Sequence, residues 1–296
     1  MPRTRPHSFV RTGPALAAAR ATKSPQTAGT SDGVYTFQGS TANFEVYYQT
    51  ALGTAGSRLA VGVLGTCEAE YNELQQIFGI SASGLPFKIR IDDGDFGAKH
   101  ETCAATELHC AAFNRDNVDL TRLLVVAEEV EVFEANLANG WDCGATNGEG
   151  LSRVLATEMY PNELDSFATA AQWLDSERPD YVSANLSKDT DAESNGCAVL
   201  FLNYLHYQRH FNWPDIVQAG GATLAETYQR LTGEADAFGP FSALLEQHYP
   251  LGTPSGVQGD NVFPLAAMSL ARQRRQAPLA SAKQAAYSGR VLARTA

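Results

Sequence analysis

The sequence has few cysteines and lacks the short motifs of several common catalytic and metal-binding sites. Only five cysteines occur in 296 residues, and no two of them have the C-x-x-C spacing of a structural zinc site. A G-x-S-x-G turn, a phosphate-binding Walker loop and a dinucleotide-binding glycine motif are also missing. No set of Ser, His and Asp residues has the spacing of a catalytic triad. The corresponding hydrolases, nucleotide-binding proteins and structural zinc domains are therefore not expected.

Long apolar runs are missing as well. The apolar residues around positions 15–19 form a short and interrupted stretch, too short for a signal peptide or a membrane span. We therefore expect a cytoplasmic protein with reduced cysteines. One candidate pairing joins Cys103 to Cys110 and Cys143 to Cys197, leaving Cys67 free. If either bridge formed, a secreted protein would fit better.

Acidic residues are scarce at both ends of the chain. Residues 1–33 contain five basic residues and one acidic residue, and residues 261–296 contain six basic residues and no acidic residue. The net charge of the whole chain is -11, so the region between the tails carries a net charge of about -21. Such a body repels nucleic acid, so nucleic-acid binding is expected only through the tails. The tails are also candidate docking segments for a protein partner.

The order of predicted elements indicates an α+β fold. We expect residues 1–33 and 253–296 to be basic tails, the first disordered, around an α+β lobe over residues 34–140 and a helical lobe over residues 141–252. Within the second tail, residues 264–276 form either one short amphipathic helix or a solvated segment. Alternating apolar and polar residues predict strands, and apolar residues at helical spacing predict helices. The predicted strands are residues 42–48, 86–91 and 106–113, and the predicted helices include residues 57–78 and 120–138.

The predicted helix over residues 120–138 contains acids within an apolar sequence, V-A-E-E-V-E-V-F. Asp119 is its expected N-cap. At 100° per residue, Glu128 and Glu131 lie about 60° apart on one face, whereas Glu129 points nearly opposite to Glu131. Burial of an unpaired carboxylate costs several kcal/mol, which a metal, a proton or an arginine relieves. The spacing therefore makes Glu128 and Glu131 candidate site residues.

Glu149 is a further acidic candidate, and Arg153 is its possible ion-pair partner. Glu149 begins a predicted helix, and Arg153 follows four residues later, which places both side chains on one face. The positive end of the helix dipole also stabilises a glutamate at this position. Glu149 is thus either a third site carboxylate or an ordinary helix-start residue, and Arg153 is a candidate to neutralise the acids.

Four segments together resemble the gluzincin branch of zinc metallopeptidases, and more closely its peptidase-MA-like domains. A-E-E-V-E stands where the family has HExxH, and G-E-G-L-S stands where the family has the motif of its third zinc ligand. The resemblance covers roughly residues 42–250 and implies a small mixed sheet, an active-site helix and a mainly helical C-terminal lobe. The four segments are residues 127–131, 148–152, 195–205 and 220–233.

The departures from the family motif decide what the resemblance implies. Ala127 and Glu131 occupy the positions of the two histidine ligands, whereas Glu128 keeps the general-base position and Glu149 the third-ligand position. Zinc needs three N, S or O ligands, so zinc is unlikely and no cofactor is expected. Clustered carboxylates suit Mg or Ca better.

We therefore expect a metallopeptidase-like domain that has lost zinc-dependent hydrolysis and serves a binding or scaffolding role. Its partner would be a protein or peptide that binds in the groove or to the basic tails. The alternative is an active hydrolase that uses Glu128, Glu131 and Glu149 with a hard divalent metal or without metal.

Histidines from elsewhere are the remaining source of ligands. The resemblance places His109 and His100 in or near the edge strand that flanks the cleft, and His109 is a candidate cleft residue. A structural, hydrogen-bonded histidine is the ordinary interpretation of both. His206 and His210 lie four residues apart and are able to share an ion, but we expect them to be solvated surface histidines.

Overall fold

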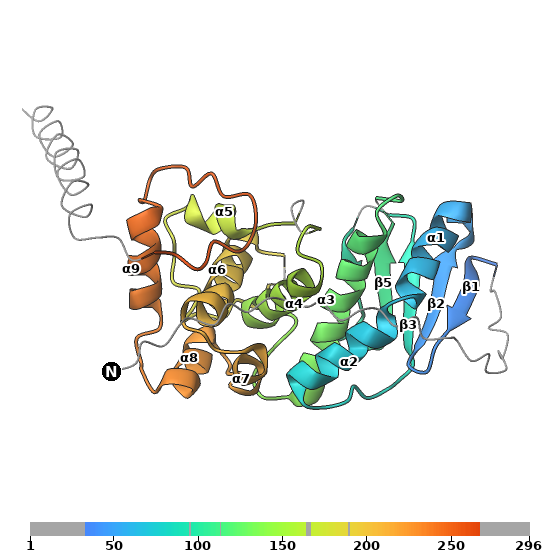
Figure 1. Cartoon of the computed structure of the whole chain (residues 1–296), viewed down its shortest axis with the longest axis horizontal. Coiled ribbons are helices and arrows are strands. Elements are labelled where there is room, and N and C mark those ends of the chain that lie inside the picture. The colour runs from blue at the N-terminus through green and yellow to red at the C-terminus, as the bar shows by residue number, and fades with distance from the viewer. Residues whose placement is uncertain (1–32, 95, 113, 164–166, 189, 267–296) are drawn as a thin grey trace, which may run out of the picture.

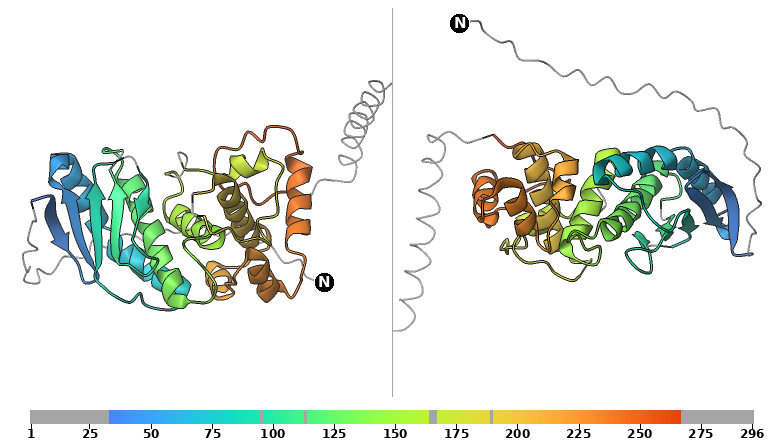
Figure 2. Two further views of the ribbon diagram at one scale, coloured as in Figure 1. Left: turned by 180° about the vertical axis from the view of Figure 1, so that it is seen from behind. Right: turned by 90° about the horizontal axis from the view of Figure 1, so that it is seen from below.

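The computed structural model describes an α+β protein with a sheet at one end and a helical lobe at the other (Figure 1). The same elongated arrangement is seen from two further sides in Figure 2. Apart from Gly33, the predicted N-terminal tail lies outside the described residues, as does the predicted C-terminal segment from residue 267 onward. The described residues are 33–94, 96–112, 114–163, 167–188 and 190–266.

The sheet has five strands in the order β1-β2-β3-β5-β4 and is mixed. The three central strands β2, β3 and β5 run parallel, whereas β1 and β4 are antiparallel to their neighbours. β4 is therefore an edge strand. The bounds are β1 Tyr35–Ser40, β2 Phe44–Gln49, β3 Phe87–Asp92, β4 Ala98–Lys99 and β5 Glu107–Ala111. The three predicted strands correspond to β2, β3 and β5, whereas β1 and β4 are additional.

One face of the sheet carries the apolar side chains and packs against three helices. Side chains alternate across a strand, so every second residue of β2, β3 and β5 points to the same face. On this face Val46 pairs with Ile89, and Ile89 with Leu108. All three are fully buried. The covering helices are α1 Gly53–Leu64, which follows the short helix η1 Thr50–Leu52, α2 Cys67–Phe78 and α3 Val118–Leu137.

The helix predicted over residues 57–78 is two helices, because the chain turns at Gly65 and Thr66. The Gly65 N–H still bonds to carbonyls of the last turn of α1, and Thr66 then precedes α2. The apolar spacing crosses the break without a change of period. The predicted apolar residues are all 2% exposed or less, and they are Leu59, Val63, Cys67, Tyr71, Leu74 and Phe78.

Helix α3 runs between the sheet and the helical lobe. Asn117 caps its N-terminus by accepting a hydrogen bond from the Leu120 N–H at 3.0 Å, so the prediction of Asp119 as N-cap was wrong by two residues. The helix ends at Ala138, whose φ of 50° lies in the left-handed region. Most of its length is buried.

The helical lobe is built around α6, of which ten residues from Ser194 to Asn203 are buried. A helix buried on all sides forms the centre of a lobe. Figure 1 shows α4 between this helix and α3. The elements are α4 Thr146–Met159, α5 Ala170–Leu174, α6 Ala192–Asn203, the π-helical turn η2 Tyr204–Gln208, α7 Trp213–Gln218, α8 Leu224–Thr232 and α9 Phe238–His248.

The start of the predicted C-terminal tail contacts the helical lobe. The Asp260 carboxylate accepts hydrogen bonds from the N–H groups of Thr169 and Ala170 at 2.7 and 2.8 Å, at the start of α5. Phe263 is buried against the lobe. The chain around Asp260 and Phe263 is therefore anchored to the helical lobe by one carboxylate and one aromatic ring.

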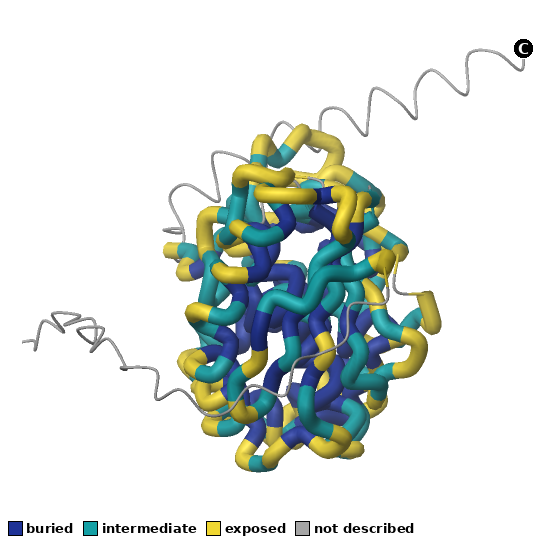
Figure 3. The backbone as a smooth tube through the Cα atoms, turned by 90° about the vertical axis from the view of Figure 1, so that its right-hand side faces the viewer, coloured by how far each residue is buried: buried dark blue, intermediate teal, exposed yellow. Residues whose placement is uncertain are grey.

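Buried residues lie in the interior of the molecule, and exposed residues lie at its surface. Figure 3 shows buried segments in the interior and exposed segments at the rim. None of the helices in the described part of the chain is both long and apolar enough to cross a membrane.

Candidate functional site

Two adjoining cavities lie between α3, α4 and the edge strand β4, and together we call them the central cleft. One has a volume of about 340 Å³ and the other about 310 Å³. Both are lined by Ala98, Glu128, Glu131 and Glu149. The structure thus brings together on one cleft the three acids that the sequence suggested. The first cavity also has Ala127, Arg153 and Phe167 in its wall, and the second has His100, Cys103 and Cys143.

The acids of α3 divide between the cleft and the core, as the helical spacing predicts. Glu128 and Glu131 line the cleft. Glu129 is fully buried beside α2, where burial and the charges of Glu70 and Glu68 raise its pKa well above the usual value. Its two carboxylate oxygens have no hydrogen-bond partner among the described residues. The raised pKa favours the protonated form of Glu129, which needs no counter-ion.

A fourth acid of α3, Glu134, was not singled out from the sequence. It is fully buried, and burial together with the charges of Glu131 and Glu149 raises its pKa well above the usual value. Neither of its oxygens has a hydrogen-bond partner among the described residues. Glu134 lies three residues after Glu131, which is helical neighbour spacing and was the available signal.

Glu131 is paired with a histidine from the end of the edge strand. The His100 Nε2 atom lies 2.9 Å from Glu131 Oε2 and 4.0 Å from Glu128 Oε2. The side chains of His100 and Glu131 are only 6% and 10% exposed, so little solvent screens the interaction. His100 follows β4 directly, and the antiparallel pairing of β4 with β5 places it beside α3. This contact is the main site feature that the sequence reasoning missed.

Glu149 is paired with Arg153. The Arg153 Nε donates to Glu149 Oε1 at 2.7 Å, and its Nη1 donates to the Phe167 carbonyl at 2.9 Å. The two side chains are 15% and 20% exposed, so the pair is largely removed from water. Arg153 therefore neutralises one of the three cleft acids.

Two glycines explain the local sequence G-E-G around Glu149. A Cβ atom on Gly148 would lie 2.3 Å from the Asp142 carbonyl oxygen, and one on Gly150 would lie 2.6 Å from the Cβ of Ala198. Both distances are far below a normal van der Waals contact, so these two positions at the start of α4 have no room for a side chain. The glycines hold Glu149 at the cleft wall between the α3–α4 loop and α6.

The residues present do not fit the zinc site of the gluzincin resemblance. Ala127 lines the cleft with a methyl group and has no donor atom. Glu131 is engaged by His100, and Glu149 by Arg153. A tetrahedral zinc site needs three donors around one point, and this set does not supply them.

A disulfide joins Cys103, in the loop after β4, to Cys143, between α3 and α4. The candidate bridges Cys103–Cys110 and Cys143–Cys197 are therefore wrong, and so is the expectation that all cysteines are reduced. Cys110 and Cys197 are buried free cysteines, as is Cys67. Cys110 points into the core under the sheet, away from the loop that carries Cys103. The pairing spans 40 residues, which no local spacing reveals.

His109 lies outside the central cleft, which corrects its choice as a cleft residue. It follows Leu108 and precedes Cys110, both buried in the core, so its ring faces the opposite side of the sheet. There its Nδ1 lies 2.7 Å from Asp92 Oδ2, and the Tyr35 hydroxyl donates to the same carboxylate. These three side chains line a further cavity, which shares Lys99, His100 and Glu101 with the smaller cavity of the central cleft.

The histidine pair on the other lobe is also not part of the cleft. The His206 ring stacks on Trp213 with 4.4 Å between ring centroids, and its Nδ1 lies 2.7 Å from the Phe211 carbonyl oxygen. The expectation of a solvated His206 is therefore wrong, whereas His210 is exposed.

The cleft thus combines three acids, one histidine, one arginine and one disulfide between two lobes. Comparison of the whole chain with protein-family models and with curated proteins found no match.

Proposed function

We propose that the central cleft is a binding groove for an extended peptide segment in a gluzincin-like domain that has lost zinc-dependent hydrolysis. The observation that carries this proposal is the cleft wall at Ala127, where the resembling family has its first histidine ligand. The second histidine position is Glu131, which His100 engages. A water molecule at this wall has no zinc-type centre to lower its pKa.

The ion pairs of the cleft also oppose the alternative of a hydrolase with a hard divalent cation. Mg or Ca would need several carboxylate oxygens directed at one point. Glu131 Oε2 already lies 2.9 Å from His100, and Glu149 Oε1 accepts from Arg153 at 2.7 Å. Each of these carboxylates already has a side-chain partner that offsets its charge, so we favour binding over catalysis.

The edge strand supports a peptide as the ligand. β4 is the last strand of the sheet, and Ala98 within it lines both cavities. An extended peptide adds to such an edge through main-chain hydrogen bonds, while neighbouring pockets select its side chains.

The walls of the cleft indicate which peptide side chains fit. Leu123, Leu124 and Phe167 form an apolar part of the larger cavity. Glu128 lies in both cavities, so negative charge adjoins this apolar wall. We expect a segment in which an apolar residue adjoins a lysine or arginine.

The experiment is selection of peptides from a random library on the disulfide-bonded chain, followed by fluorescence anisotropy with a synthetic peptide. Ala127→Trp places an indole in the larger cavity and should weaken binding at least about tenfold, equivalent to about 1.4 kcal/mol. Leu251→Trp is the matched control, because Leu251 is 48% exposed and distant in sequence from the cleft elements. It should leave binding unchanged. Equal affinity of both variants, with intact thermal melts, would remove the proposal.

A further inference from the structure

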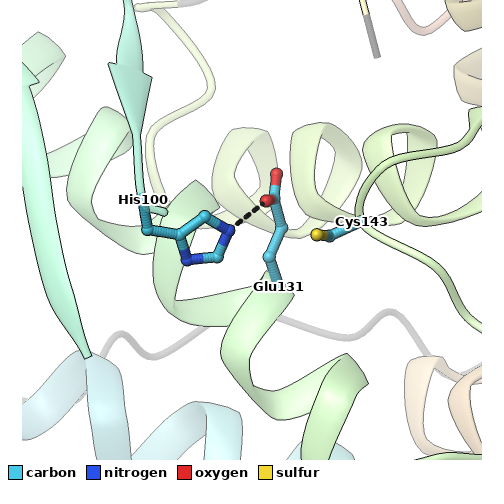
Figure 4. Close-up of side chains that lie close together, drawn as sticks. All are labelled: His100, Glu131 and Cys143. Atoms are coloured by element: carbon cyan, nitrogen blue, oxygen red, sulfur yellow. Dashed lines mark hydrogen bonds and ion pairs between the residues drawn. The ribbon is translucent and has the colours of Figure 1, made fainter. Parts of the chain in front are cut away.

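Three donor atoms of different chemical types converge in the smaller cavity of the central cleft. His100 follows β4, Glu131 lies on α3, and Cys143 lies between α3 and α4. One nitrogen, one oxygen and one sulfur atom from these residues all lie within 4.8 Å of one another. Figure 4 shows the His100 ring and the Cys143 sulfur on either side of the Glu131 carboxylate.

This donor set differs from the one that the gluzincin resemblance implies. Only Glu131 is shared, and the imidazole comes from the edge strand rather than from the helix. One imidazole, one carboxylate and one thiolate are ligands that zinc accepts in tetrahedral sites, with the fourth position left to water. A soft sulfur ligand also favours zinc over Mg or Ca.

The disulfide prevents these three donors from binding a metal. A thiolate is a metal ligand, whereas Cys143 Sγ is bonded to Cys103. In the same state Glu131 Oε2 lies at hydrogen-bond distance from His100 Nε2, so the two remaining donors bind each other. The oxidised chain therefore holds the three donors side by side without presenting them to a cation.

We propose that reduction of the Cys103–Cys143 disulfide opens a zinc-type metal site formed by His100, Glu131 and Cys143. The inference goes beyond the peptide-binding proposal, because it concerns a cation held by donors in the smaller cavity and is tested without a peptide. In this proposal the disulfide controls metal binding, because the cation binds only after the bond is reduced.

The redox step balances with a dithiol as the reductant. The dithiol gives two electrons and becomes a disulfide, the bond between Cys103 and Cys143 breaks, and the two protons pass to the two sulfur atoms. Metal binding then releases the Cys143 proton to solvent. His100 binds through Nε2 when its ring proton is on Nδ1, an atom that has no hydrogen-bond partner among the described residues.

Burial and charge favour this set over the neighbouring cluster of Cys103, Asp142 and Cys143. The side chains of His100 and Glu131 are 6% and 10% exposed, whereas Asp142 is exposed to solvent. Donors that are already desolvated and held in place lose less hydration and less conformational entropy when they bind a cation. The Glu131 carboxylate and the Cys143 thiolate together balance the two positive charges.

The test is titration of the purified chain with Co²⁺, followed by thiolate-to-cobalt charge-transfer absorption and by competition with Zn²⁺. Cys103→Ser frees Cys143 without a reductant and should bind one Co²⁺ per chain with the charge-transfer band. The oxidised wild-type chain should lack the band and gain it after treatment with a dithiol. His100→Ala or Glu131→Gln in the Cys103→Ser background should weaken binding at least about tenfold.

Two controls decide the assignment. Cys143→Ser leaves Cys103 free, and the double variant Cys103→Ser/Cys143→Ser retains only the buried cysteines Cys67, Cys110 and Cys197. Neither should show the band. The proposal is overturned if Cys143→Ser binds as tightly as Cys103→Ser, if the double variant does so, or if the oxidised wild type binds as tightly as the reduced one. If Cys103→Ser does not fold, the reduced wild type gives the same readout.

Discussion

The two faces of helix α3 hold acids in opposite ways. On the cleft face, Glu131 has a histidine partner at 2.9 Å. On the core face, Glu129 has no hydrogen-bond partner among the described residues, and burial raises its pKa. One carboxylate has an imidazole partner at hydrogen-bond distance, and the other lies in the core, where burial favours its protonated form. The same residue type within a few positions therefore lines a cleft on one face and packs in the core on the other.

The largest expected effect comes from removing a cation on the cleft side. Arg153→Met removes the guanidinium that offsets the charge of Glu149 in a largely buried position. Breaking a fully buried pair costs about 3–5 kcal/mol, and this pair is slightly exposed, so we expect a loss of about 2–3 kcal/mol in the free energy of unfolding. Denaturant unfolding measures it. The double variant Glu149→Gln/Arg153→Met should recover part of the loss, and a wild-type stability for the single variant would contradict the contrast between the faces.

A smaller effect of opposite sign is expected on the core side. The folded-state pKa of Glu129 is raised, so the folded chain binds more protons than the unfolded chain, and this contribution to stability falls as the pH rises above the unfolded value. Glu129→Gln removes that dependence. It should have a higher free energy of unfolding than wild type at pH 8, with the difference vanishing near pH 4.

Thermal and denaturant unfolding across this pH range measure the Glu129 effect. Glu73→Gln is the matched control, because Glu73 is exposed on α2. It should leave the pH profile unchanged. A Glu129→Gln curve parallel to that of wild type would show that Glu129 has the same pKa in the folded and unfolded chains, which would contradict the prediction.

The smallest effect is expected on the outer face of the sheet. His109→Gln loses the contact with Asp92, but its side chain is 29% exposed, so the stability loss should stay below about 1 kcal/mol. Peptide binding in the central cleft should not change, because His109 points to the other side of the sheet. A loss of peptide affinity in the anisotropy assay would place His109 back in the groove.

Local pattern was enough to predict much of the fold. Alternation gave the strands later found as β2, β3 and β5, and helical spacing separated Glu129 from Glu128 and Glu131. These features depend on residues within one or two turns of each other. The break at Gly65 was missed because the apolar period continues through it.

Contacts between segments that are distant in the sequence could not be predicted from local patterns. The His100–Glu131 pair joins residues 31 positions apart, and the Cys103–Cys143 bridge spans 40. Each depends on how β4 and the α3–α4 loop meet across the cleft. The direction of the His109 side chain depends on which face of β5 is buried. Because Leu108 and Cys110 point into the core, His109 points to the opposite face.

The measurement that tests the central claim most directly is the zinc content of the disulfide-bonded chain together with its peptide hydrolysis. The chain would be purified without reductant, incubated with zinc and freed of unbound metal. We predict no stoichiometric zinc and no cleavage of peptides that bind the groove. One zinc per chain, with cleavage that is lost in Glu128→Gln, would contradict the account.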